Sequence, residues 1–126
     1  PPEKRIDLSD HPELKACLQV PLCGEPRLAY CYVRHDRRPQ FEDYVEQNFS
    51  GIAQLYVSQD LVDENLYGLG RAHPELANRT GDYTLVMEDS YVMIDSLPGD
   101  TTPQLVGYHG GLSSQEIYVP LILVDL

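Results

Sequence analysis

The sequence predicts a mixed α and β fold, in which flanking helices pack on a mixed sheet that includes a β-hairpin. Two segments, near residues 9–18 and 39–53, have a proline at or near the start of the helix and carry apolar residues at helical spacing. Short apolar and aromatic runs separated by turn residues are typical of strands. Two of these runs, 83–88 and 91–95, flank Asp89 and Ser90 and predict the hairpin, which argues against a purely parallel sheet.

The first half of the chain is predicted to alternate strands and helices. Residues 5–8 form a short edge strand, and residues 9–13 begin a helix that runs to about Leu18. Residues 20–26 hold two prolines and a glycine and are predicted to be a loop. A buried strand over 28–33, a helix from Pro39 and a strand over 54–58 follow. If those two strands are parallel in one sheet, their connection is a right-handed crossover.

The second half is predicted to hold shorter elements. A helix over 60–66 ends at Gly68 and Gly70, and His73 begins another helical turn. The hairpin follows, then a turn-rich loop over 97–103. A last strand over 118–124 completes five or six strands. No linker divides the chain, so residues 1–126 are predicted to form a single domain.

Composition narrows the classes of function. The 126 residues carry a net charge of −11, with 42% hydrophobic and 23% charged residues, which is typical of a globular domain. The acidic balance argues against a nucleic-acid surface or an anionic membrane, because phosphate backbones are bound by Lys and Arg. No apolar run approaches the roughly 18 residues that a membrane span needs, so no membrane partner is predicted.

The cysteine count favours reduced thiols. Cys17, Cys23 and Cys31 are odd in number and form no C-x-x-C pair, which favours a cytoplasmic protein without disulfides. A zinc site built from His11, Cys17 and Cys23 lacks the usual tight ligand spacing. Small buried thiols are the favoured interpretation of all three.

The run GYHGGLS at 107–113 is the strongest functional signal. His109 lies between glycines, and glycine permits positive φ and close backbone approach. Ser113 and Glu116 have the spacing of a capping box, which begins a helix of about one turn before Pro120. His109 is therefore expected on an exposed turn, where it either ligates a metal ion or merely forms a hydrogen bond within the turn.

The stretch GYHGGLSSQEIYVPLIL at 107–123 resembles the C-terminal metal-site segment of the alkaline phosphatase superfamily. It looks most like the bacterial type I phosphodiesterase/nucleotide pyrophosphatase branch and the related PglZ proteins. RTGDYTLV at 79–86 resembles the strand that precedes that segment. The resemblance is clear over residues 73–124. It implies a portion of an alkaline-phosphatase-like fold, with His109 as one ligand of a two-metal centre that holds zinc or manganese.

By this resemblance, the parent protein is a hydrolase that cleaves a phosphate-ester substrate. The family's nucleophile, its Asp-His-Gly segment and its first carboxylate ligands have no counterpart here, and the chain begins at Pro1 without Met. We therefore expect a C-terminal fragment that is inactive alone and needs the rest of the parent catalytic domain. Much of residues 1–80 would be a cap or an insertion. A strand exposed at 118–126 would also favour homodimers through exposed edges.

A second class of function stays open. In this alternative the chain is a non-catalytic, PglZ-like module whose exposed apolar surface binds a protein partner. The other candidate residues favour structural roles. Asp82 is expected to accept hydrogen bonds at a turn rather than bind metal, and Tyr108 is expected to pack in the core rather than line a substrate pocket. The basic cluster Arg34, Arg37 and Arg38 could grip phosphate but is more typical of a solvated surface.

Overall fold

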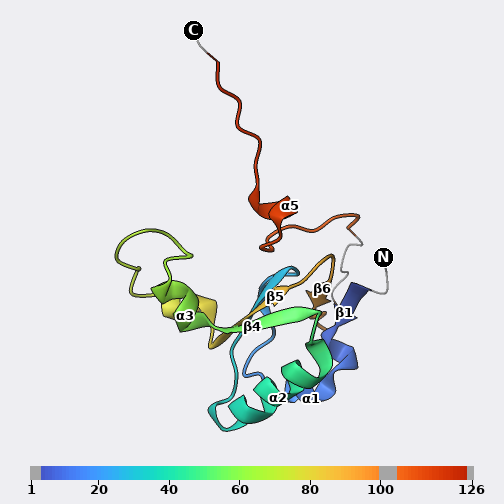
Figure 1. The fold of residues 1–126 in the computed structure, drawn as a ribbon. Coiled ribbons are helices and arrows are strands. Elements are labelled where there is room, and N and C mark those ends of the chain that lie inside the picture. The colour runs from blue at the N-terminus through green and yellow to red at the C-terminus, as the bar shows by residue number, and fades with distance from the viewer. Residues whose placement is uncertain (1–3, 100–104, 125–126) are drawn as a thin grey trace.

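The computed structural model describes residues 4–99 and 105–124 (Figure 1). The strands are β1 (Arg5–Asp7), β2 (Cys23–Glu25), β3 (Leu28–Cys31), β4 (Ala53–Val57), β5 (Tyr83–Met87) and β6 (Val92–Ile94). The α-helices are α1 (Pro12–Cys17), α2 (Arg38–Phe49), α3 (Ser58–Asp63), α4 (Leu76–Thr80) and α5 (Ser114–Ile117), and two 3-10 turns are η2 (Leu8–Asp10) and η3 (His35–Arg37). The predicted mixed α and β class is confirmed.

The main sheet has four strands in the order β2-β3-β5-β4, and every neighbouring pair is antiparallel. Because β3 and β4 both run antiparallel to β5, they run parallel to each other in one sheet. The helix α2 connects them, as the strand–helix–strand pattern predicted. The connection passes over β5, which comes later in the sequence and fills the position between them.

The hairpin predicted over 83–95 is wrong. β5 belongs to the main sheet, whereas β6 pairs in parallel with β1 as a separate two-stranded sheet. Asp89, with φ of 46°, turns the chain out of the main sheet. Both strands are buried along their whole length, so no alternation of apolar and polar residues marked which neighbour each would take.

Helices α1 and α2 pack side by side and cover one face of the main sheet (Figure 1). The core between these layers combines a stripe on α2 with inward-facing residues of β3 and β5. The α2 stripe is the predicted one: Phe41, Val45 and Phe49 are buried at four-residue spacing. In α1, Leu14 and Cys17 are buried with Leu18, the residue that follows the helix, as the pattern of that segment indicated.

Two predicted boundaries shifted. The segment 20–26, predicted to be a loop, holds β2, which forms a hairpin with β3 through Pro26 and Arg27. The helix predicted over 60–66 spans Ser58–Asp63 as α3, so it both begins and ends earlier than predicted, and Ser58 is buried at its start. There the Ser58 hydroxyl donates to the Thr80 carbonyl at 2.8 Å and lies 2.9 Å from the Thr84 hydroxyl, which satisfies these polar groups beneath the sheet.

The strand predicted over 118–124 is absent. These residues, which we call the C-terminal arm, lie in extended coil beyond α5 and lead away from the rest of the molecule (Figure 1). The apolar side chains of the arm are 73–85% exposed. The sequence has strand character there, but a strand forms only where a neighbour accepts and donates its backbone hydrogen bonds. No other described segment takes that place.

Candidate functional site

His109 lies on an exposed turn, as the glycine-flanked sequence predicted. Gly110 has φ of +96°, a conformation that other residues rarely adopt, and lies against the Glu25 side chain of β2. The His109 imidazole is exposed and makes no hydrogen bond with any residue that the structure describes. One of the two readings, a histidine held by hydrogen bonds within its turn, therefore has no support among these residues.

The predicted capping box is present immediately after the turn. Ser113 is the N-cap residue of α5, and the reciprocal bonds between Ser113 and Glu116 are both formed. The Ser113 hydroxyl also donates to Glu116 Oε2 at 2.6 Å, and the Gly111 backbone N–H donates to Glu116 Oε1 at 3.0 Å. One carboxylate thus fixes both the start of α5 and the backbone two residues after His109.

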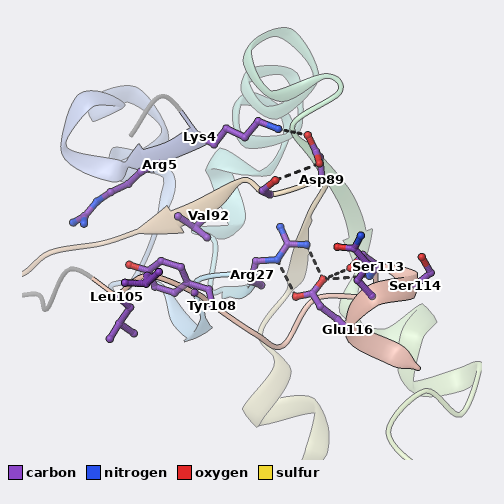
Figure 2. A pocket seen from close by; sticks show the side chains of 14 residues that line it. Lys4, Arg5, Arg27, Asp89, Val92, Leu105, Tyr108, Ser113, Ser114 and Glu116 are labelled. Atoms are coloured by element: carbon purple, nitrogen blue, oxygen red, sulfur yellow. Dashed lines mark hydrogen bonds and ion pairs between the residues drawn. The ribbon is translucent and has the colours of Figure 1, made fainter. Parts of the chain in front are cut away.

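Arg27, which the sequence did not single out, anchors this segment to the body of the protein (Figure 2). From the β2–β3 turn, Arg27 Nε donates to Glu116 Oε1 at 3.0 Å, and a terminal nitrogen of its guanidinium donates to Oε2 at 2.8 Å. Its other terminal nitrogen donates to the Tyr91 carbonyl at 2.6 Å and the Glu88 carbonyl at 3.4 Å. The residue is only 4% exposed. A forked pair of this kind fixes orientation as well as distance.

Gly111 lies where no side chain fits. A Cβ at this position would lie 2.6 and 2.8 Å from the Glu116 carboxylate oxygens and 2.9 Å from the Arg27 guanidinium. The paired glycines were expected to let the backbone approach a metal site closely, and Gly111 does have close neighbours. The group approached is the Arg27–Glu116 pair, a contact that the sequence did not indicate.

The environment of Glu116 predicts a pH dependence. Hydrogen bonds, those from Arg27 above all, lower the pKa of Glu116 from its usual 4.5 to about 2, although burial acts in the opposite direction. A carboxyl with a lowered folded-state pKa contributes stability above its unfolded pKa and loses it as pH falls through the folded value. We therefore expect the protein to lose about 2–3 kcal/mol from this group between about pH 5 and pH 2.

The measurement compares urea unfolding of the natural protein with that of Glu116→Gln across this pH range. The gap in unfolding free energy between the two proteins should narrow as pH falls. Protonation removes the Glu116 charge from the natural protein at low pH, whereas the substitution removes that charge at every pH. A gap that stays constant from pH 6 to pH 2.5 would show that the carboxylate carries no such linkage.

Asp82 was expected to accept hydrogen bonds at its own turn, but its donors lie far away in the sequence. Its carboxylate accepts from the Val33 backbone N–H at 2.9 Å and from the Arg38 guanidinium. The basic cluster does not converge on one point: Arg34 donates to the Leu18 carbonyl at 3.3 Å, whereas Arg37 lies exposed. Arg38 forms an ion pair with Asp82, so its guanidinium is not fully solvated.

The cysteines are free, but only two are buried. Cys17 and Cys31 lie in the core, whereas Cys23 is exposed on the edge strand β2, so the prediction of three buried thiols is wrong for Cys23. β2 is the end strand of the four-stranded sheet. The imidazole of His11 contacts the Tyr44 hydroxyl at 2.8 Å through Nδ1. Among the described residues, no group of three or more His, Cys, Asp or Glu side chains is arranged to hold a metal ion.

Tyr108 lines a cavity instead of packing in the core, contrary to the favoured expectation. The reason is that 105–112 lies on the surface of the domain, attached through Glu116, and does not enter the layer between the sheet and α2. The described part of the chain contains no helix that is both long enough and apolar enough to cross a membrane.

In comparisons with known proteins, no family model, no curated protein and no solved structure matches the chain significantly. The fold thus defines the class of the protein as a mixed α and β domain. Any closer assignment rests on the residues of the His109 segment themselves.

Proposed function

We propose that this chain is part of a metal-dependent phosphodiesterase or nucleotide pyrophosphatase, in which His109 supplies one ligand of a two-metal centre. The observation that carries the proposal is the placement of His109. Its imidazole is exposed on a glycine-shaped turn, and the Arg27–Glu116 pair fixes the backbone on its C-terminal side. A fixed backbone helps to hold a ligand side chain in the required geometry. The acceptor that usually orients the second ring nitrogen of a ligating histidine would come from outside the described residues.

Of the described residues, His109 alone is assigned as a metal ligand in this proposal. A neutral imidazole is a common ligand of zinc, whereas manganese prefers oxygen ligands, which would have to come from the rest of the site. The remaining ligands and the nucleophile would come from outside the described residues. When bound, a pair of divalent ions would lower the pKa of a nucleophile and stabilise charge on the oxygens of a phosphoryl group. The part played by this chain is to hold its imidazole in place.

The C-terminal arm supports the idea of a larger assembly. Its residues Tyr118, Val119, Leu121, Ile122, Leu123 and Val124 are apolar on both sides of an extended chain. A run without polar alternation is typical of a strand that is covered on both faces, as in a layered α/β sheet. The arm and His109 belong to one segment, so a partner sheet that took up the arm would also approach His109.

The proposal is tested in a longer polypeptide that includes sequence upstream of Pro1. We expect His109→Ala to lower the cleavage of bis(4-nitrophenyl) phosphate by at least about 100-fold, since even the loss of a supporting residue costs 10–100-fold. Bound metal, measured by mass spectrometry of the purified protein, should fall as well. His35→Ala is the matched control, because His35 is also an exposed histidine on a turn. Full activity and unchanged metal content in His109→Ala would refute the proposal.

The arm also favours a second candidate, a non-catalytic module that binds a protein partner. In that case its exposed apolar residues form the interface, and the glycine turn has only an architectural role. Leu121→Asp would then abolish partner binding, whereas His109→Ala would leave it unchanged. The metal measurement separates the two candidates, because only the hydrolase proposal requires His109 to retain metal.

A further inference from the structure

A cavity of about 630 Å³ lies beside the His109 turn, between the β1–β6 pair and the segment 105–116 (Figure 2). This volume is within the usual range for small-molecule sites, about 300–1,000 Å³. Four parts of the sequence form its walls: residues 4–5, Arg27, residues 89–92 and the segment that carries His109. Two of these walls are joined by the Arg27–Glu116 pair, so the cavity depends on the same anchor as the turn.

The charged residues of the cavity are unequally engaged. Lys4 forms an ion pair with Asp89, and Arg27 forms one with Glu116. Arg5 also lines the cavity, and it makes no ion pair with any residue that the structure describes. Three cations and two carboxylates therefore face this space, in a chain whose net charge is −11. The surplus of one guanidinium makes the cavity a place where an anionic group is favoured, and a guanidinium suits phosphate in particular.

The other lining groups define the rest of a ligand. Tyr108 contributes an aromatic ring, and Val92 and Leu105 add apolar surface near it (Figure 2). Ser113 and Ser114 bring hydroxyl groups. An apolar lining with a few polar groups is the usual composition of a small-molecule site. Together these groups suit a compact molecule that has a flat ring and one phosphate.

We propose that this cavity binds an organic phosphate with an aromatic ring, with Arg5 contacting the phosphate and Tyr108 the ring. The site deepens the proposed function and rests on it for its biological meaning, because Tyr108 in the wall directly precedes His109. The cavity would hold the part of a phosphate-ester substrate that surrounds the reacting group. It would thus set which esters are accepted.

Phenylphosphonate is the probe, because it carries both features and cannot be hydrolysed. Titrated into the 126-residue chain and followed by amide NMR, it should shift the signals of Arg5, Val92 and Gly107. Arg5→Gln should weaken binding by about tenfold, the effect of losing one charge-assisted hydrogen bond. Tyr108→Ala should weaken it as well. Lys15→Gln is the matched control, because Lys15 is a cation outside the cavity that pairs with Asp95. It should bind as the natural protein does.

Two further ligands separate the contributions, since inorganic phosphate and phenol each carry one feature and should bind more weakly than the probe. Equal affinity of Arg5→Gln and the natural chain, or shifts spread over other surfaces, would overturn the assignment. His109→Ala should bind phenylphosphonate normally, because no metal is involved in this measurement. Two results together separate the proposals. If phenylphosphonate binds this cavity but the longer polypeptide shows no metal-dependent cleavage, the hydrolase proposal is refuted and the ligand-binding proposal stands.

Discussion

Replacing Arg27 by Met is expected to release the His109 turn and α5 from the body of the protein. The substitution keeps an apolar side chain of similar length but removes the donors that satisfy Glu116 and the Tyr91 carbonyl. Removing one partner of a buried ion pair costs about 3–5 kcal/mol, because the other charge stays buried without compensation. The Glu116 side chain is 15% exposed, so we expect the low end of this range, about 3 kcal/mol.

The loss should be local more than global. Segment 107–117 can detach and place Glu116 in water, which limits the penalty to the free energy that held the segment in place. Amide hydrogen exchange measures this directly. Exchange at the Gly111 N–H should accelerate by roughly 100-fold, which corresponds to about 3 kcal/mol at 1.4 kcal/mol per factor of ten. The unfolding free energy from urea titration should fall by less.

Two controls define what Arg27 contributes. Arg27→Lys keeps the charge without the fork and should recover only part of the protection, since an ammonium group cannot bond both carboxylate oxygens in the same way. Arg37→Met removes an exposed pair with Asp36 and should cost no more than about 1 kcal/mol. Unchanged exchange at Gly111 in Arg27→Met would mean that the turn is held by other contacts.

Interactions between residues that are close along the chain could be predicted from the sequence. The capping box needs only Ser113 and Glu116, three residues apart, and it formed as predicted. The α2 stripe likewise follows from spacing within one helix. In each case the physical cause lies within one or two turns of backbone.

Contacts between distant segments were not readable. Arg27 and Glu116 are 89 positions apart, and a lone arginine after Pro26 in a hairpin turn carries no sign of its partner. The only signal was indirect, since Glu116 in a capping box has lone pairs left for a cation. The prediction that β5 pairs with β6 was wrong for the same reason, because the true partners of both strands are distant in the sequence. β5 and β6 are fully buried runs, so their periodicity could not tell a hairpin from two separate sheets.

The C-terminal arm shows a third case: the strand predicted over 118–124 needs a neighbouring strand that the described residues do not supply. Its composition is that of a strand, yet in isolation it has no neighbouring strand and stays extended and exposed. Sequence pattern reports the environment in which a segment is stable, while the structure of one chain reports only the environment that this chain provides. The disagreement at 118–124 is therefore itself a reason to look for a partner surface.

Truncating Phe41 to Ala is expected to destabilise the whole domain by about 3–5 kcal/mol, the usual cost of removing a buried phenylalanine. Phe41 is 0% exposed and packs on the Tyr83 ring at 5.2 Å between centroids, where α2 meets β5. Domains of this size are stable by only about 5–15 kcal/mol.

The midpoint of urea unfolding should therefore fall sharply while the slope stays constant, since the same surface is exposed on unfolding. Phe41→Leu should cost less, because it leaves a smaller cavity. Tyr118→Ala, which truncates an aromatic residue that is 80% exposed on the arm, should change the free energy by no more than about 0.5 kcal/mol. If Phe41→Ala were as stable as Tyr118→Ala, α2 would not pack on the sheet as described.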